Sequence, residues 1–242
     1  MTAGGERDGE ATVRAGHRPR WKLALAAGGA VIAVLAPIWG PRALAELAYF
    51  RVRRVEIVGA RFVQPSDILG RLHVDTMSSV WQPVASLEER IASHPGVRSV
   101  RVGRRLPGTL VVEITERWPV ALVPTPSGLV PIDEDGAALP IDLTRTTVDA
   151  PIVAYRDAGL FRLLGRMRVE APELYGRVSE AARAGKDEVL LRISSVPVRA
   201  MADVSVERLA DVGPVEQDLA RRQLRAAEID LRYRDQVIAR LQ

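Results

Sequence analysis

The three histidines are the first side chains to consider for chemistry, because an imidazole can act as a general base or as a metal ligand. His17, His73 and His94 lie far apart, and none has a second ligand at a spacing typical of metal sites. His73 and Asp75 could pair, but no serine lies in a nucleophile-elbow motif that would complete a triad. We therefore expect surface or capping histidines.

The carboxylates could serve in acid–base catalysis or in calcium binding, and neither use fits their spacing. Asp133, Glu134 and Asp135 form a cluster without the later ligands of a calcium loop, so a hairpin turn is expected there. Glu113 and Glu116 would project from opposite faces of one strand. The chain also lacks cysteine and a phosphate-binding glycine loop. We therefore expect a protein that is not an enzyme and has no cofactor, metal or small-molecule substrate.

A long apolar segment near the amino terminus indicates a membrane span, relative to which the rest of the chain must be placed. Residues 23–41 contain no charged side chain, and a helix of that length reaches roughly 28 Å, close to the roughly 30 Å hydrocarbon thickness of a bilayer. We expect a single transmembrane helix over residues 21–41. Residues 1–20 have almost no apolar side chains and are expected to be a disordered cytoplasmic tail.

The orientation of this span follows from length rather than from charge, since arginines flank it on both sides. A short basic leader before one span and a large following domain is typical of a signal anchor, which would place the bulk of the chain outside the cytoplasm. A cleaved signal peptide, with residues 43–45 as its cleavage site, is the alternative. The leader and the apolar region are both longer than is usual for such peptides.

The formal net charge of +4 comes mostly from scattered arginines, which are not interleaved with aromatic residues as nucleic-acid surfaces require. We expect no nucleic-acid partner, and attraction to anionic headgroups explains the charge more simply. Arg98, Arg101, Arg104 and Arg105 could form a positive strand that contacts headgroups or an acidic partner. A solvated strand face is the alternative.

Residues 50–118 show the order strand, helix, helix, strand, strand. Apolar residues alternate in the expected strands and recur every three or four residues in the expected helices. The segments are Val52–Val58, a short helix containing Ile68 and Leu72, Val84–Ser93, Val97–Arg104 and Thr109–Glu116.

Residues 119–242 are expected to form a second, mixed β domain with several helices, so that the whole chain is α+β. The expected strands are Val120–Val123, Gly128–Ile132, Ile152–Ala154, Val189–Ile193, Val196–Met201, Glu228–Tyr233 and Gln236–Leu241. The expected helices are a stripe from Leu160 to Met167, Pro172–Gly185, Val206–Val212 with Ser205 as its cap, and a last one from Pro214 to about Arg222.

Several of these segments resemble the POTRA domain, in particular the version found in the FtsQ family of bacterial cell-division proteins, called DivIB in some bacteria. Within residues 50–118, the resemblance rests on residues 52–59, 94–102, 106–110 and 116–121. The second region is similar to the β domain of that family at residues 172–175, 229–233 and 236–241. The resemblance extends from about Trp21 to the end of the chain.

The resemblance implies a single-pass scaffold in the bacterial inner membrane at the division septum. Such a scaffold recruits the small single-span proteins FtsB and FtsL and helps to control septal peptidoglycan synthesis. In that family the last strands of the β domain take up FtsB by strand addition, and the POTRA domain contributes to recruitment. Arg232 and Tyr233 match the family's Arg-Tyr pair beside that contact, and residues 236–241 match the strand itself.

The residues themselves also favour a binding edge near the carboxyl terminus. Ile229, Leu231 and Tyr233 would share one strand face and pack inward, while Asp230 and Arg232 on the other face would contact a partner. The expected partner-binding residues are Ile229, Asp230, Leu231, Arg232, Tyr233, Gln236, Val237, Ile238, Ala239, Arg240 and Leu241.

Two other classes of protein stay open at this point. A POTRA-containing envelope assembly or secretion component would append a β-barrel, and the sequence has no series of roughly ten-residue alternating segments to build one. A membrane-anchored envelope hydrolase would need a catalytic cluster, which the spacing of the histidines and carboxylates does not provide.

Overall fold

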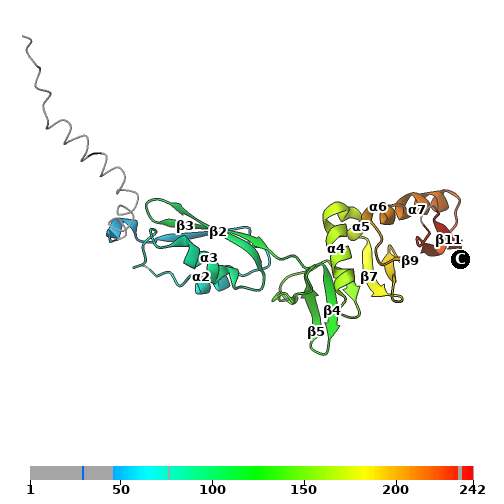
Figure 1. The fold of residues 1–242 in the computed structure, drawn as a ribbon, viewed down its shortest axis with the longest axis horizontal. Coiled ribbons are helices and arrows are strands. Elements are labelled where there is room, and N and C mark those ends of the chain that lie inside the picture. The colour runs from blue at the N-terminus through cyan, green and yellow to red at the C-terminus, as the bar shows by residue number, and fades with distance from the viewer. Residues whose placement is uncertain (1–28, 30–45, 76, 234–235, 242) are drawn as a thin grey trace, which may run out of the picture.

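A computed structural model describes residue 29 and residues 46–75, 77–233 and 236–241 of the 242-residue chain (Figure 1). The expected tail (1–20) and transmembrane helix (21–41) lie outside these residues, apart from residue 29 itself. Among the described helices, none combines the length and the apolar character that crossing a bilayer requires. The described chain forms two lobes in succession, and each lobe has its own sheet.

The three-stranded lobe, residues 48–118, has the order of elements expected from the sequence. Its elements are η1 (Ala48–Phe50), β1 (Arg54–Val58), α2 (Pro65–Leu72), α3 (Val84–Ala92), β2 (Val97–Arg105) and β3 (Thr109–Glu116). The sheet order is β1-β3-β2, with β1 parallel and β2 antiparallel to β3. Ile68 of α2, Leu87 of α3 and Leu110 of β3 are fully buried in one core.

The eight-stranded lobe, residues 119–241, contains a mixed sheet and four helices among its described residues. Its elements are β4 (Ala121–Thr125), β5 (Gly128–Ile132), β6 (Ile152–Val153), α4 (Ala158–Glu170), α5 (Pro172–Tyr175), β7 (Val178–Arg183), β8 (Glu188–Ile193), β9 (Val196–Met201), α6 (Val206–Ala210), α7 (Val212–Arg221), β10 (Ala226–Asp230) and β11 (Ile238–Leu241). The sheet order is β11-β10-β9-β8-β7-β6-β4-β5. The α+β class expected from the sequence is therefore correct for the described residues.

Helix α4 supplies much of the core of the eight-stranded lobe. It begins where the Asp157 side chain accepts a hydrogen bond from the N–H of Leu160 at 2.9 Å, and it buries Phe161 against the sheet. Tyr175 follows on α5, and its hydroxyl donates to the carbonyl of Val120 at 3.1 Å. Burial raises the pKa of Tyr175 to about 12. The tyrosine thus joins the helical layer to the start of the sheet.

The helix expected over Pro172–Gly185 is wrong beyond its first turn. Only α5 is helical, and the chain continues as strand β7, which pairs with β8. A β-bulge between Val178 and Glu180 turns both Val178 and Ala181 toward the core. Because these buried residues are three positions apart, the strand imitates the spacing of an amphipathic helix.

A buried carboxylate organises the three-stranded lobe. Glu116, at the end of β3, is 4% exposed and accepts hydrogen bonds from the backbone N–H groups of Arg61, Phe62 and Val63 at 2.8–3.0 Å. It therefore holds the loop between β1 and α2 against the sheet. Glu113 of the same strand is exposed on the other face, as its spacing predicts.

The lobes meet around Trp118, which lies just after β3. The guanidinium groups of Arg61 and of Arg168 on α4 lie 5.0 and 4.8 Å from its ring, and Phe62 packs against it edge to face at 5.2 Å. Arg117 adds an ion pair of 2.7 Å to the carboxylate of Asp133, which is nearly fully buried. These contacts join residues of both lobes, so they restrict the angle between them.

The reversal at residues 133–136 is a turn, as expected from the sequence. The carboxylate of Asp133 accepts hydrogen bonds from the backbone N–H groups of Asp135 at 3.1 Å and Ala137 at 2.7 Å, and Gly136 has a positive φ of 85°. The acidic cluster thus shapes this turn, and Asp133 also contacts Arg117.

Replacing Glu116 with alanine is expected to destabilise the three-stranded lobe by about 3 kcal/mol, because its backbone donors lose their acceptor. Thermal unfolding of the full chain in detergent, followed by circular dichroism, measures this change. Glu113→Ala removes an exposed carboxylate from the same strand and is the matched control, with a shift close to zero. Equal melting temperatures for the wild type and Glu116→Ala would contradict this account.

Replacing Trp118 with alanine is expected to loosen the contact between the lobes without unfolding either one. Because the chain has no native cysteine, spin labels can be placed at Leu106 and Leu224, which are exposed in different lobes. Pulsed electron spin resonance should show a broader distribution of distances in Trp118→Ala. Val169→Ala, an exposed neighbour of Arg168 on α4, should leave the distribution narrow. Identical distributions in all three chains would refute the role given to Trp118.

Candidate protein-binding edge

The structure describes two of the three histidines, His73 and His94. His94 is 6% exposed, its Nδ1 accepts the N–H of Gly96 at 3.0 Å, and burial lowers its pKa. It is therefore a buried turn residue, whereas the sequence suggested a surface or capping one. His73 is exposed at the end of α2, and the Asp75 carboxylate bonds with Ser78. Within the described ranges, no group of three His, Asp or Glu side chains could hold a metal ion.

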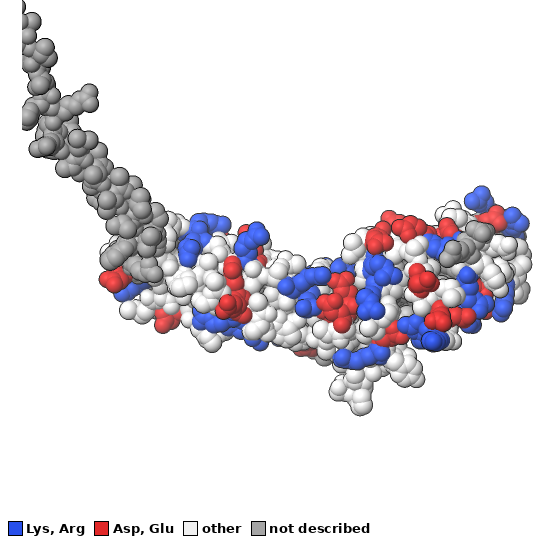
Figure 2. All heavy atoms as spheres, viewed as in Figure 1, with Lys and Arg blue, Asp and Glu red and all other residues white. Residues whose placement is uncertain are grey.

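Three of the four arginines considered for a positive strand, Arg98, Arg104 and Arg105, are engaged within the chain. Arg98 pairs with Glu134 at 2.5 Å, Arg105 pairs with Glu56 at 2.7 Å, and Arg104 donates to the backbone carbonyls of Val80 and Gln82. Basic and acidic side chains are also intermixed over the face drawn in Figure 2. A solvated face with internal pairs explains this strand better than a free basic surface.

The edges of the two sheets differ in how their backbone groups are covered. At β2, the outward N–H of Val102 donates to the Glu88 carboxylate at 2.8 Å. At β5, the carbonyl of Pro131 accepts the N–H of Leu139 at 2.9 Å, and Ile132 forms a bridge with Ala138. A covered edge cannot readily accept another strand. At these two edges the chain itself therefore covers part of the outward backbone.

The edges at β1 and β11 are not covered in this way by the described residues. Strand β11 pairs with β10 on one side, and alternate residues of an antiparallel strand direct their N–H and C=O groups to the other side. None of its four residues is fully buried, and Ile238 and Leu241 are 40% and 50% exposed. Strand β11 thus offers both backbone and side-chain contacts to an incoming segment.

The open edge lies one strand further than the residue pattern suggested. Strand β10 ends at Asp230, and β11 pairs along its outer side, so Glu228–Tyr233 is not itself the open strand. Ile229 and Leu231 are buried, as expected for an inward face. Tyr233 lies beyond the strand and is 52% exposed, so it does not share their place in the core.

The charged groups of Asp230 and Arg232, which the sequence assigns to partner contact, are bonded to each other within the chain. Asp230 is 5% exposed, and the Arg232 guanidinium bonds both of its carboxylate oxygens at 2.7–3.1 Å. Arg232 also donates to Glu188 at 2.8 Å. The hydrogen bonds from Arg232 lower the pKa of both carboxyl groups. The pair therefore stabilises the end of β10.

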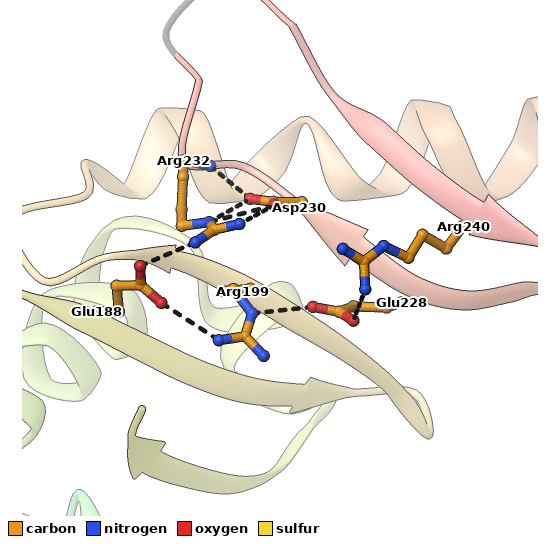
Figure 3. A network of polar contacts seen from close by, with 6 residues as sticks. All are labelled: Glu188, Arg199, Glu228, Asp230, Arg232 and Arg240. Atoms are coloured by element: carbon orange, nitrogen blue, oxygen red, sulfur yellow. Dashed lines mark hydrogen bonds and ion pairs between the residues drawn. The ribbon is translucent and has the colours of Figure 1, made fainter. Parts of the chain in front are cut away.

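A ladder of charged side chains crosses the polar face of the sheet toward β11 (Figure 3). Arg199 of β9 contacts Glu188 of β8 at 3.2 Å and Glu228 of β10 at 2.9 Å. Arg240 of β11 contacts Glu228 at 3.3 Å. The sequence reasoning missed Glu188, Arg199 and Glu228, because their partners are far apart in the chain.

Hydrogen bonds from Arg208 hold the chain between β10 and β11. The guanidinium of Arg208 on α6 donates to the backbone carbonyls of Tyr233 at 2.6 Å and Gln236 at 2.7 Å. Helix α6 is itself capped by the Ser205 side chain, as the sequence predicted. A groove of about 480 Å³ lies beside these contacts, lined by Arg208, Leu231, Arg232 and neighbouring residues. Arg208 is a positioning residue that local sequence patterns do not reveal.

Replacing Arg208 with alanine is expected to free β11 from β10 while the core stays folded. Amide hydrogen exchange at residues 238–241 should accelerate about tenfold, since two charge-assisted hydrogen bonds are lost. Mass spectrometry of the full chain measures this. Arg222→Ala, which removes an exposed pair with Asp218, is the control and should leave exchange at 238–241 unchanged. Unaltered exchange in Arg208→Ala would show that β11 is held by other contacts.

Comparison with known proteins adds an independent observation. A family model described as "POTRA domain, FtsQ-type" matches residues 50–117. Cell division protein FtsQ of Novosphingobium aromaticivorans is 31% identical over 70% of this chain and 56% of its own length. Cell division protein FtsQ of Myxococcus fulvus is 27% identical over 90% of this chain and 83% of its own. Cell division protein DivIB of Geobacillus kaustophilus is 24% identical over 63% of each chain.

The length of the match varies among these relatives. The chain spans about half the length of the first two curated relatives that it matches, at 56% and 46% of their residues. Among solved structures, the major extracytoplasmic domain of DivIB from Geobacillus stearothermophilus is 22% identical with a TM-score of 0.34. That alignment covers 44% of this chain and 97% of the other.

Proposed function

Because the chain belongs to the FtsQ/DivIB family of bacterial cell-division proteins, we propose that it is a non-enzymatic scaffold of the division machinery. It docks other division proteins along the open edge of β11. In this proposal residues 50–118 form a POTRA domain that contributes to recruitment. Residues 119–242 form the β domain that provides the docking edge.

The observation that carries this proposal is the uncovered outer side of β11. An extended segment laid along it gains backbone hydrogen bonds, and the side chains of β11 select which segment fits. Strand β11 differs from the open edge at β1 in that it continues the charged ladder and lies next to the Arg208 contacts. It is therefore held in a fixed position before a partner arrives, which lowers the entropic cost of binding.

The proposed partners are the FtsB- and FtsL-type division proteins, with FtsB taken up as an added strand. Family membership supports this choice, together with the resemblance of residues 229–233 and 236–241 to the family's terminal segments. Through these partners the scaffold helps to control septal peptidoglycan synthesis. The same membership supports a location at the division septum.

A membrane anchor completes the proposal. Residues 21–41 span the inner membrane once, the amino terminus is cytoplasmic, and both lobes lie outside the cytoplasm. The support is the uncharged stretch of residues 23–41 and its length relative to a bilayer. Docking by β11 would then occur on the outer side of the membrane, where an added strand can come from another membrane-anchored protein.

In this proposal Tyr233 contacts the partner through its side chain, and a separate segment forms the docking strand. Tyr233 has its carbonyl fixed by Arg208 while its side chain is 52% exposed, so the ring can contact a partner without a large loss of order. Residues 236–241 supply the backbone and the side chains of the docking strand. The docking strand is supported on its inner side by β10 and the residues that follow it, namely Ile229, Asp230, Leu231 and Arg232.

Replacing Tyr233 with alanine is expected to weaken capture of the FtsB-type protein of the same organism by about 2 kcal/mol, which is roughly 30-fold. Val237→Pro should weaken capture at least as much, because proline restricts the backbone that leads into β11. Co-purification with the detergent-solubilised full chain, followed by a titration, measures both effects.

Leu129→Ala is the matched control, since it removes an exposed apolar side chain from β5 at the opposite edge of the same sheet. It should leave capture unchanged. All variants should retain the melting temperature of the three-stranded lobe. Undiminished capture by both Tyr233→Ala and Val237→Pro would refute the proposed docking mode. Turnover of an envelope substrate by the purified chain would contradict the proposal of a non-enzymatic scaffold.

A further inference from the structure

The sign of the charge alternates from strand to strand on the polar face of the eight-stranded sheet. Glu188 lies on β8, Arg199 on β9, Glu228 on β10 and Arg240 on β11 (Figure 3). Each charge contacts the opposite charge of the next strand, at 3.2, 2.9 and 3.3 Å in that order. Cross-strand pairs of opposite charge on one face stabilise neighbouring strands, and like charges oppose them.

The ladder is complete inside the sheet and incomplete at its edge. Arg199 bonds a carboxylate on each side, and Glu228 bonds an arginine on each side. Arg240 contacts Glu228 on one side, and no carboxylate of the described residues pairs with it on the other. Its side chain is 68% exposed, against 31% for Arg199. The outer side of Arg240 thus has room for an acidic group.

The opposite face of β11 has a different character. Ala239 lies opposite the buried Ile229 in the register, so Ala239 and Leu241 are on the core face of the sheet. Leu241 is 50% exposed at the edge of that face. An apolar side chain on an added strand would cover it, because side chains alternate between the two faces along a strand.

We propose that β11 selects an extended segment of a partner protein that places an Asp or Glu beside Arg240 and apolar side chains beside Ala239 and Leu241. This inference rests on the proposed docking function and specifies the partner's sequence. An added strand lies about 4.8 Å from β11, which brings a carboxylate on the polar face within reach of the Arg240 guanidinium. Arg240 is then a specificity-determining residue of the edge.

A second copy of β11 does not fit this edge. Ile238–Leu241 contains no acidic residue, so β11 from another molecule would offer Arg240 no opposite charge and would add a second arginine. Charge complementarity therefore favours a different protein as the occupant.

The test compares the peptides that different variants select. A display library of short random peptides is panned on the full chain in nanodiscs, with Val237→Pro used to remove peptides that bind elsewhere. The wild type should select alternating apolar residues with Asp or Glu at one position. Arg240→Glu should select Lys or Arg at that position, and Arg240→Gln should show no preference for charge.

Arg192→Glu is the matched control, because Arg192 pairs with Glu180 on the same polar face but on β8, away from the edge. It should leave the acidic preference intact. Since Arg240→Glu places a second carboxylate beside Glu228, hydrogen exchange at residues 238–241 checks that β11 remains paired. Arg240→Gln tests the same idea without that repulsion.

The outcomes separate this inference from the function on which it rests. An acidic preference that persists in both Arg240 variants, or the lack of any charge preference in the wild type, overturns the role of Arg240. In that case strand addition still stands if Val237→Pro abolishes binding. If the wild type selects no peptide that depends on an intact residue 237, both the docking edge and the proposed specificity are refuted.

Discussion

The outward backbone groups of β11, which no described residue of the chain covers, are the feature on which the proposed function depends. A sheet edge in water can accept another strand unless it is covered or protected in another way. This chain covers part of the β2 edge with the Glu88 carboxylate and the end of β5 with the segment that follows it. At β11 the described residues hold the edge strand in place from its inner side, and none of them pairs with its outer side. Of the two edges without such contacts among the described residues, β1 and β11, the proposed docking uses β11.

The reinforcement uses charged groups that are not part of the edge. Arg208 ties the chain between β10 and β11 to α6, and Arg232 neutralises the buried Asp230 at the end of β10. Neither arrangement needs a reactive group, a metal or a cofactor. Both convert a short, exposed strand into a surface with a defined position, which is the physical requirement for recognition by backbone pairing.

Local patterns predicted most of the elements. They failed at strand β7 and at the pairing of β10 with β11. The alternation in β3, with Leu110 and Val112 inward and Glu113 outward, was sufficient to recognise the strand. The β-bulge in β7 defeated the same reasoning, because two core residues three positions apart look helical. The residue pattern at 229–233 indicates a binding edge but does not show that the later strand β11 pairs along the outer side of β10.

The sequence by itself determined the order of elements in the first lobe and most of the apolar core positions. These follow from periodicity and from turn residues, which act between neighbours in the chain. Only the tertiary structure decided which strand is the edge, that Asp230 is buried, and that Glu188, Arg199 and Arg208 support β11. The edge follows from pairing of β10 with β11 at separations of 8 to 15 positions. The supporting side-chain contacts of Glu188, Arg199 and Arg208 span 11 to 44 positions, and no local pattern records such contacts.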